Sequence, residues 1–486
     1  MALTIPVAEI VESSRNPLLG KHASWGRVLL GEIATIQNGF PFKSTQFTKS
    51  AGMPLIRIRD VGANCTDTNY VGDYDPAFIV KADDLLIGMD GDFNCARWRG
   101  PDGLLNQRVC RVILKSDIYH PKLLDYALPG YLKAINDMTS SVTVKHLSSK
   151  SIAEIPLPLP PMGQQKRIVA EIEKQFSRLD EAVASLKRVK ANLKRYKAAV
   201  LKAAVEGRLV ETEAELARRE GRGYETGEQL LQRILETRRS QWKGKGKYKE
   251  PAAPDTTDLP ELPEGWVWTS VDQLTGDSLI GLDRGRDQQN SEGIGTPYVK
   301  MNNVTMEGEV TSEGLVYVDA SNEEKERFNL QATDLLFNTR NSKELVGKVG
   351  IVASLPRGAI YNNNLMRLRT INGAMPSFVC SQMCSNGFRK RMELVKKATT
   401  NVAAVYAKDL FPLPLALPPL TEQQRIVAEV DRRLSLISEV EAQVDANLLR
   451  ADRLRQSILT SAFSGLLGSR FFETMPNAAT KASGKA

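Results

Sequence analysis

The chain has 486 residues, of which 42% are hydrophobic and 25% are charged, and its formal net charge is +8. This length is too great for one hydrophobic core, so we expect about three to four domains of an ordinary globular protein. No run of 18 apolar residues occurs and the first residues do not resemble a signal peptide, which excludes a spanning helix and favours a cytoplasmic protein. The five cysteines form no CxxC pair and the three histidines are scattered, so a metal site is not expected.

In chain order, the sequence predicts two mixed α/β regions, each followed by a long helix. Residues 1–24 resemble a loose leader, and residues 25–153 contain short strands, turns and one helix at Lys122–Met138. The strands that we expect in this region are Val28–Ile36, Leu55–Ile58, Leu85–Gly88 and Val109–Leu114.

The second half of the chain repeats this order. Residues 154–209 carry the first long helix, and residues 210–263 combine charged helices at Glu211–Glu220 and Gly227–Trp242 with a linker rich in Lys, Gly and Pro. Residues 264–409 repeat the α/β pattern, residues 410–467 hold the second long helix, and we expect the small polar tail 468–486 to be disordered.

The two long helices are copies of one segment. Residues 160–209 align with residues 418–467 without a gap, and 16 of the 50 aligned pairs are identical. In both copies two prolines precede the helix and a glycine, Gly207 or Gly465, follows it, which are typical start and stop signals. The apolar positions recur every 3.5 residues on average, the period of a coiled coil, over a helix about 65 Å long. We therefore expect the two copies to pack against each other as an antiparallel spacer, although an ordinary pair of core helices is an alternative.

The duplication continues more weakly into the α/β regions. Residues 52–61 are similar to 295–304, residues 78–86 to 328–336, and residues 106–112 to 362–368. The offset between the copies changes along these segments and becomes constant only in the helices. Insertions and deletions therefore fall in the globular parts, as expected for divergent binding domains on a constant scaffold.

Motifs for catalysis are missing from the sequence. It contains no phosphate-binding loop, no dinucleotide-binding glycine motif, no Asn/Asp-Pro-Pro-aromatic element of an amino-methyltransferase, and no convincing nuclease carboxylate pair. The chain therefore has the pattern of a binding and organising protein.

These features resemble the specificity subunit of type I restriction–modification systems. The two segments from Pro160 and Pro418 that continue into Arg-Ile-Val-Ala-Glu carry the resemblance, together with Asp84–Asn94 and Asn106-Gln107-Arg108. The resemblance implies an α/β (α+β) fold in which two mixed α/β target-recognition domains, residues 25–153 and 264–409, are separated by a long antiparallel two-helix spacer with pseudo-two-fold symmetry.

The resemblance also implies a function and partners. Such a subunit has no catalytic activity; it reads a bipartite, asymmetric site on double-stranded DNA and docks two methyltransferase subunits and two restriction/translocase subunits. S-adenosylmethionine, ATP and magnesium belong to those partners, so this chain itself is expected to hold no cofactor and no metal, and to bind no membrane.

Candidate DNA-binding residues follow from the side chains that suit base edges. Arginine pairs with guanine, and asparagine or glutamine pairs with adenine, in the major groove. Each candidate could equally be a turn residue or a phosphate contact, and Asn106 and Asn362 could serve only to shape turns. The candidates are Arg57, Arg59, Asn94, Gln107 and Arg108 in the first domain and Lys300, Asn302, Asn303, Arg340, Asn341, Lys343 and Asn364 in the second.

Two other functions compete with this interpretation. A single-chain DNA-modifying enzyme with duplicated recognition domains would require catalytic motifs that the sequence lacks. A structural coiled-coil protein that only bridges partners would not need two large polar α/β domains.

Overall fold

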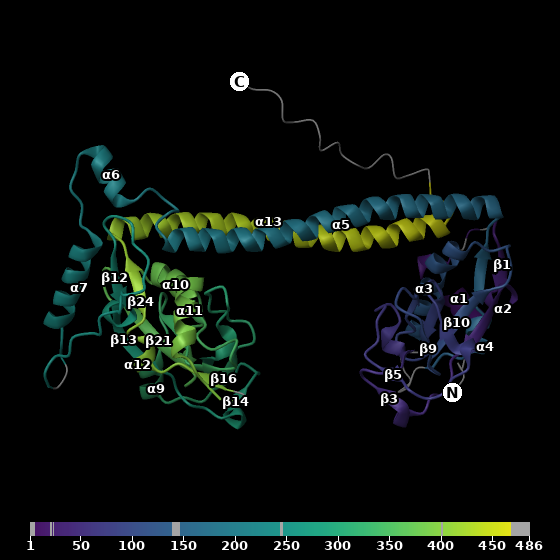
Figure 1. The fold of residues 1–486 in the computed structure, drawn as a ribbon, viewed down its shortest axis with the longest axis horizontal. Coiled ribbons are helices and arrows are strands. Elements are labelled where there is room, and N and C mark those ends of the chain that lie inside the picture. Colours follow the sequence, from purple (N-terminus) through teal and green to yellow (C-terminus); the bar gives the residue numbers. More distant parts are fainter. Residues whose placement is uncertain are drawn as a thin grey trace, which may run out of the picture. The chain divides into compact units, whose positions relative to one another are not determined.

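The computed structural model describes residues 5–19, 22, 24–138, 146–243, 246–399 and 402–467 (Figure 1). The expected tail at 468–486 lies outside these residues. The chain divides into two compact units, the first formed by residues 1–188 and 444–486 and the second by residues 189–443. Each unit contains one α/β domain and parts of both long helices.

The α/β domain of the first unit is built on two sheets. The core sheet has four strands in the order β2-β10-β7-β8 and is antiparallel throughout. A second sheet has five short strands in the order β3-β5-β4-β9-β6, with β4 and β9 parallel. A separate pair, β1 with β11, joins the two ends of the domain. The strands are β1 (Gly26–Leu29), β2 (Ala34–Asn38), β3 (Phe47–Thr48), β4 (Met53–Ile56), β5 (Asn69–Tyr70), β6 (Ile79–Val80), β7 (Leu85–Gly88), β8 (Cys95–Arg97), β9 (Gly103–Leu105), β10 (Val109–Leu114) and β11 (Pro156–Leu159).

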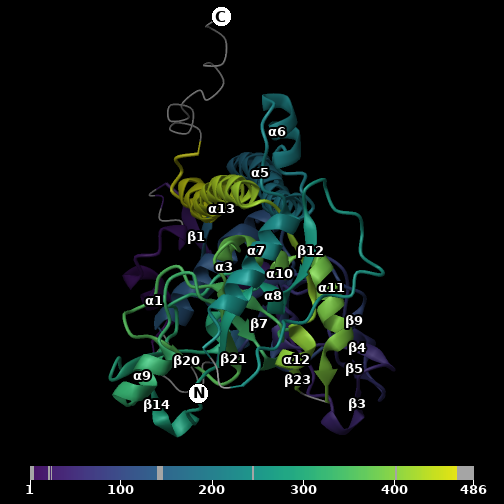
Figure 2. The same ribbon diagram turned by 90° about the vertical axis from the view of Figure 1, so that its left-hand side faces the viewer.

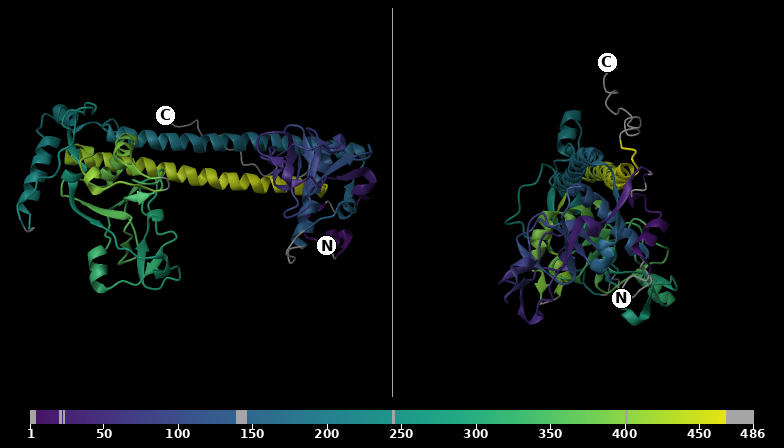
Figure 3. Two further views of the ribbon diagram at one scale, coloured as in Figure 1. Left: turned by 60° about the horizontal axis from the view of Figure 1, so that its bottom comes forward. Right: turned by 90° about the vertical axis from the view of Figure 1, so that its right-hand side faces the viewer.

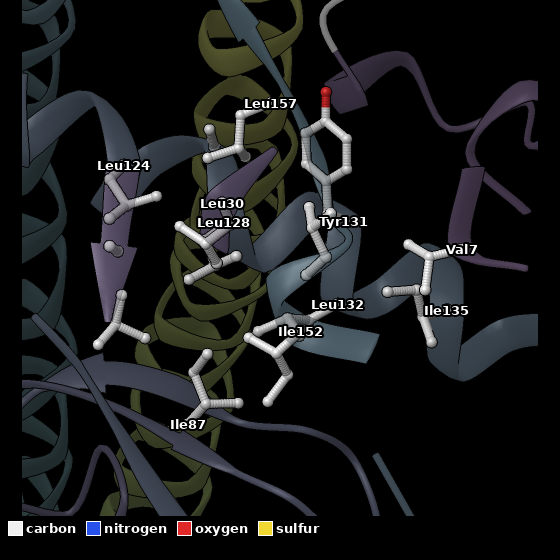
Figure 4. Packing of buried hydrophobic residues seen from close by; sticks show 14 of the residues in the cluster. Val7, Leu30, Ile87, Leu124, Leu128, Tyr131, Leu132, Ile135, Ile152 and Leu157 are labelled. Atoms are coloured by element: carbon white, nitrogen blue, oxygen red, sulfur yellow. The ribbon is translucent and has the colours of Figure 1, made fainter. Parts of the chain in front are cut away.

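Helices cover one face of the core sheet and bury its apolar side chains. The α-helices of this domain are α1 (Val7–Ser13), α2 (Leu30–Ile33), α3 (Pro121–Met138) and α4 (Ser149–Ala153), and its 3₁₀ helices are η1 (Pro17–Leu19), η2 (Ser44–Gln46), η3 (Ile58–Asp60) and η4 (Pro76–Phe78). Figure 4 shows Leu124, Leu128, Tyr131 and Leu132 of α3 packed with Ile87 of β7 and their neighbours. The predicted helix Lys122–Met138 and the predicted strands Leu85–Gly88 and Val109–Leu114 are confirmed.

Three local predictions need correction. The expected strand Val28–Ile36 is interrupted by the helical turn α2, because Leu30 and Ile33 are both buried at a spacing of three and the Glu32 carboxylate accepts the Leu29 N–H at 2.9 Å. The strand expected at Leu55–Ile58 ends at Ile56, where η3 follows. The segment expected to be a loose leader contains α1, which places Val7, Ile10 and Val11 in the core against α3.

The second unit repeats this architecture. The order β13-β21-β17-β19 corresponds to the core sheet, β14-β16-β15-β20 to the second sheet, and β12-β24 to the pair that joins the domain ends. An additional three-stranded sheet has the order β18-β23-β22. The strands are β12 (Val267–Ser270), β13 (Thr275–Ile280), β14 (Gln289–Asn290), β15 (Thr296–Val299), β16 (Val316–Val318), β17 (Leu335–Asn338), β18 (Arg340–Asn341), β19 (Val349–Ile351), β20 (Ile360–Tyr361), β21 (Leu365–Thr370), β22 (Lys397–Ala398), β23 (Ala403–Ala404) and β24 (Pro414–Leu417).

The helices of the second unit include two that the first unit lacks among its described residues, α6 and α7, near the positions predicted for them. Figure 2 looks onto this unit and shows α7 beside α8 and β12, where Leu230 and Ile234 pack against Val271 and Leu274. The α-helices are α6 (Glu213–Glu220), α7 (Gly227–Ser240), α8 (Val271–Leu274), α9 (Asn322–Phe328), α10 (Pro376–Cys384), α11 (Asn386–Val395) and α12 (Ala407–Leu410), and the 3₁₀ helices are η5 (Arg286–Gln288) and η6 (Met301–Asn303).

The two long helices are α5 (Met162–Val205) and α13 (Leu420–Phe463), each of 44 residues, and Figure 3 shows them from two further sides. In the first unit, Ile172 and Phe176 of α5 are buried with Ile458 and Ala462 of α13. In the second unit, Val200 and Ala204 of α5 are buried with Ile426 and Val430 of α13. As the residue number increases along α5, the residue number of its partner on α13 decreases. This confirms the predicted antiparallel packing along the apolar seam. The apolar positions that recur every 3.5 residues include Val189, Tyr196 and Val440, and these three side chains are exposed.

Both helices end in the same way. Gly207 and Gly465 have φ angles of 67° and 75°, the left-handed region that favours glycine. The next residue then donates its N–H to the carbonyl five positions back, Arg208 to Ala203 at 2.8 Å and Leu466 to Ser461 at 2.9 Å. These are the hydrogen bonds of a Schellman cap, so the predicted stop signals act as expected.

A buried glutamine fixes the start of each long helix to the α/β domain of its unit. Gln165 and Gln423 are aligned in the repeat, and each has no exposed surface. The Gln423 side-chain amide donates to the Pro418 carbonyl at 3.0 Å and the Gly373 carbonyl at 3.2 Å, and its oxygen accepts the Met375 N–H at 2.9 Å. The Gln165 side chain makes the same three bonds, to Pro160 O and Ile118 O at 2.9 Å and from the His120 N–H at 2.7 Å. We call this arrangement the glutamine clamp.

Candidate nucleic-acid interface

In the first unit, three segments that carry candidate residues meet at one end of the sheets. Because β4 and β9 are parallel, the turn after β4, which forms η3, and the turn at 105–108 after β9 leave the same sheet edge. The Met89 N–H donates to the Arg108 carbonyl at 2.9 Å, which joins the loop 88–94 to the turn at 105–108. A Cβ on Gly88 would lie 2.8 Å from Ile58 Cγ1, so the same loop also touches η3.

The second unit brings the equivalent segments together. Strands β15 and β20 are parallel, so η6 and the turn at 362–364 leave one edge. The Thr339 N–H donates to the Asn364 carbonyl at 2.9 Å, which joins this turn to the segment after β17. The Lys348 ammonium donates to the carbonyls of Met301 and Val304 at 2.7 and 2.6 Å, which holds η6 on β19, and burial lowers the pKa of this lysine.

Four polar residues build these turns. The Asp60 carboxylate accepts the Arg57 N–H, and the Asn303 amide oxygen accepts the Lys300 N–H, both at 2.9 Å. Asn106 and Asn362 are buried and accept the N–H two residues later in the chain, which confirms that they shape turns.

Asn303 therefore does not suit the role predicted for it. Its side chain is fully buried, its oxygen caps η6, and its amide group donates to the Glu313 carbonyl at 2.8 Å. Because both polar ends are used inside the protein, Asn303 shapes the loop and presents nothing to a base edge.

In the first unit, the candidates differ in how free their side chains are. Arg108 is exposed and pairs with Asp90 at 2.8 Å, and the second oxygen of Asp90 lies 2.7 Å from His146 Nδ1. Arg59 is exposed and pairs with Asp67. Three further candidates make no side-chain hydrogen bond or ion pair within the described part of the chain: the exposed Asn94 and Gln107 and the half-buried Arg57.

In the second unit, three candidates are exposed and their side chains have no hydrogen bond or ion pair to the described residues: Asn302, Arg340 and Lys343. Lys300 donates to Gln289 Oε1 at 2.8 Å, and Asn341 donates to Asn338 Oδ1 at 2.9 Å. Asn364 is half-buried, and its carbonyl holds the turn together. The exposed donors lie on η6, on the short strand β18 and on the loop after it, whereas the side chains that support these segments are engaged.

The cluster of Arg108, Asp90 and His146 is the feature that sequence reasoning missed. His146 is separated from Asp90 by 56 positions and follows a segment without a motif, so no sequence signal joined it to the site. One Asp90 oxygen pairs with Arg108 and the other contacts His146, which fixes the direction of the Arg108 guanidinium before any ligand binds.

The chemistry of these surfaces is that of hydrogen-bond donors on exposed loops. Among the described residues, no group of three or more His, Cys, Asp or Glu is arranged to hold a metal ion. In that part of the chain, no helix is long and apolar enough to cross a membrane. Arginine, lysine and amide side chains on loops that rigid sheets support suit the recognition of base edges and phosphates.

Comparison with known proteins defines the class. The family model of the type I restriction modification DNA specificity domain matches residues 23–195 and 284–448. These two matches cover most of both α/β domains and most of both long helices, and the chain belongs to this family of DNA specificity proteins.

Similar proteins extend this result to nearly the whole chain. It is 32% identical over 484 residues to the specificity subunit of the type I restriction enzyme EcoBI of Escherichia coli, with 96% of this chain and 92% of that protein covered. It is 23% identical over 471 residues to the EcoKI specificity subunit of Escherichia coli strain K12, with coverage of 93% and 91%. The chain is thus a specificity subunit of a type I restriction–modification system, the non-catalytic subunit that recognises DNA sequence.

The fold agrees with a solved structure. A chain from a study of complex assembly and conformational transition of the type I restriction–modification system superimposes with a TM-score of 0.61 at 18% identity, covering 92% of this chain and 99% of that chain. The predicted mixed α/β fold with two recognition domains and a helical spacer is confirmed.

Proposed function

We propose that this subunit reads a bipartite, asymmetric site on double-stranded DNA, one half-site through the loops of each α/β domain. One observation carries this proposal: both units present the same three loop positions at the same sheet edge, but with different side chains. The exposed Gln107 and Arg108 of the first unit align with Asn363 and Asn364 of the second. Equivalent loops with different donors would read two different half-sites.

The side chains that we assign to DNA are the exposed donors without a partner among the described residues, together with the half-buried Arg57 and with Arg108, which Asp90 positions. A bidentate guanidinium suits guanine, so Arg108 and Arg340 are the first candidates for reading a guanine in each half-site. Arg57, Asn94, Gln107, Asn302 and Lys343 complete the set with base or phosphate contacts. Asp90 and His146 act through Arg108 and are positioning residues.

The limits of the recognition domains, 25–153 and 264–409, belong to this proposal, as do the partners. We infer that the subunit docks two methyltransferase subunits and two restriction/translocase subunits, which supply S-adenosylmethionine, ATP and magnesium. This arrangement places the protein in the cytoplasm, where its five free cysteines would remain reduced.

A domain exchange tests the two-reader arrangement. Replacing residues 25–153 by the equivalent region of a relative should change one half of the methylated sequence and leave the other half unchanged, when methylated adenines are mapped in cells. A change in both half-sites would contradict the proposal.

Single substitutions test the residue assignments. Arg108→Ala should weaken binding of the cognate site by about 1–3 kcal/mol and relax one base position if the residue reads a base. A phosphate contact would instead weaken all sequences about equally and reduce the dependence on salt. Lys115→Ala is a matched control, because Lys115 is a cation that follows the opposite end of β10, where it donates to the Gly31 carbonyl. An equal loss in both variants would remove Arg108 from the interface.

A further inference from the structure

The first unit has a pocket of about 340 Å³ near the start of α5 and the end of α13. Ile168 and Ala462 form apolar parts of its wall, and Leu467 lies at its edge as the last described residue. The remaining lining residues are His22, Trp25, Gln164, Arg167, Glu171 and Gly465.

The same location in the second unit is occupied. The repeat aligns Gln164 with Glu422 and Arg167 with Arg425. In both units an indole N–H fixes the first of these residues: Trp25 Nε1 donates to Gln164 Oε1 at 3.0 Å, and Trp266 Nε1 donates to Glu422 Oε1 at 2.9 Å.

In the second unit, the segment that follows α5 fills this location with the start of α6. The Glu213 N–H donates to the second Glu422 oxygen at 2.8 Å, and the Glu213 carboxylate pairs with Arg425. Ala214 is buried next to it. Burial alone would raise the pKa of Glu213, but hydrogen bonds from Arg425 and Arg222 outweigh it and lower that pKa.

In the first unit, the equivalent groups are donors that have no acceptor among the described residues. The side-chain oxygen of Gln164 accepts the Trp25 indole N–H. The NH₂ group of the same Gln164 side chain has no hydrogen-bond partner among the described residues. Arg167 is exposed and makes no ion pair or hydrogen bond with the described part of the chain. The second unit has Glu422 at this position, which only accepts hydrogen bonds, whereas the first unit has Gln164, whose NH₂ group donates. The occupant of the pocket in the first unit must therefore offer carbonyl or carboxylate oxygens.

We propose that residues 468–473 of this chain occupy the pocket, as residues 210–215 occupy its counterpart. They continue directly from Leu467. The spacing of the repeat, carried past its end at 209 and 467, places Phe472 at the position of the buried Ala214 and Glu473 at that of Glu215. Phe472 supplies apolar surface for Ile168 and Ala462, and Glu473 supplies the carboxylate that Arg167 lacks. The segment completes, at the first unit, the scaffold that α6 completes at the second.

Photo-crosslinking in the complete chain tests this assignment. With Phe472→benzoylphenylalanine at low protein concentration, mass spectrometry should find crosslinks within one chain to residues 162–171 or 462–467. The same probe at Ala479 is the control and should give none of these. Crosslinks from position 472 only to other places, or between two copies, would overturn the proposal.

Charge exchange and truncation provide independent readouts. Arg167→Glu should abolish the crosslink from position 472, and the added Glu473→Arg should restore it. Removal of residues 468–486 should lower Tm by at least about 2 °C, whereas removal of 474–486 should not. No rescue, or equal Tm values for both truncations, would contradict the docking. A probe at Ile168 that crosslinks to a methyltransferase subunit in the assembled complex would assign the pocket to that partner instead.

Discussion

Removal of the Gln423 side chain should destabilise the second unit strongly. Gln423→Ala leaves the carbonyls of Pro418 and Gly373 and the N–H of Met375 without their partner. A buried polar group without a hydrogen bond costs about 1–3 kcal/mol, and partial entry of water reduces the sum for three groups. We therefore expect a loss of about 3–5 kcal/mol in the free energy of unfolding.

Urea denaturation followed by circular dichroism measures this loss, with the midpoint shifted at constant slope. Gln424→Ala is the matched control, because Gln424 is exposed on the next helical position and should change stability by less than about 0.5 kcal/mol. Gln165→Ala should produce a loss of similar size in the first unit, since it makes the same three bonds. If Gln423→Ala cost no more than Gln424→Ala, the glutamine clamp would not be what fixes the helix to the domain.

Three further predictions concern the long helices. Arg425→Ala should cost about 2–3 kcal/mol in urea denaturation, because the buried Glu213 then keeps one ion-pair partner, Arg222, and the hydrogen bond with Thr421. The aligned Arg167→Ala should cost less than about 1 kcal/mol, and equal losses would contradict the assigned ion pair. Leu179→Asp places a charge in the buried seam and should lower the free energy of unfolding by about 3 kcal/mol or more. Ser177→Asp is the control, because Ser177 is exposed and the change should be nearly neutral. Similar Tm values for the two variants would show that the seam is not packed. Hydrogen bonds from Arg432 and Arg433 lower the pKa of Glu429 to about 2, so its stabilising contribution is present above its ordinary value of 4.5 and is lost as pH falls from there toward 2. Between pH 4.5 and about 2, the Tm of Glu429→Gln should therefore fall less with decreasing pH than the Tm of the unchanged protein. The same dependence of Tm on pH in both proteins would refute the pairing.

The long helices illustrate what local sequence can predict. Their ends lie within about two residues of the predicted positions, because proline before the start and glycine after the end act through backbone conformation alone. Their partner was also predictable, since a seam with a 3.5-residue period on a long helix needs a matching seam, and the duplicated copy supplies it.

The short strands and the site were predicted less completely. Leu85–Gly88 is a continuous apolar run and Val109–Leu114 is apolar apart from Arg111, and both strands were predicted correctly. Two-residue strands such as β3 or β5 have no pattern long enough to detect. Asn303 has the residue type of a base reader, but its burial depends on how Glu313 and η6 fold over it. The sequence showed the loop positions but not which side chain in each loop faces outward.

The sequence by itself determined the duplication, the two long helices with their caps, the mixed α/β class and the resemblance to specificity subunits. These features depend on residues close in the chain or on comparison of the two copies. The tertiary structure alone decided that α1 packs into the core, that Asp90 joins Arg108 to His146, and that Gln165 and Gln423 clamp each helix to its domain. Each of these contacts joins residues 18 to more than 100 positions apart, and the hydrogen bonds or apolar burial that stabilise them exist only after the chain has folded.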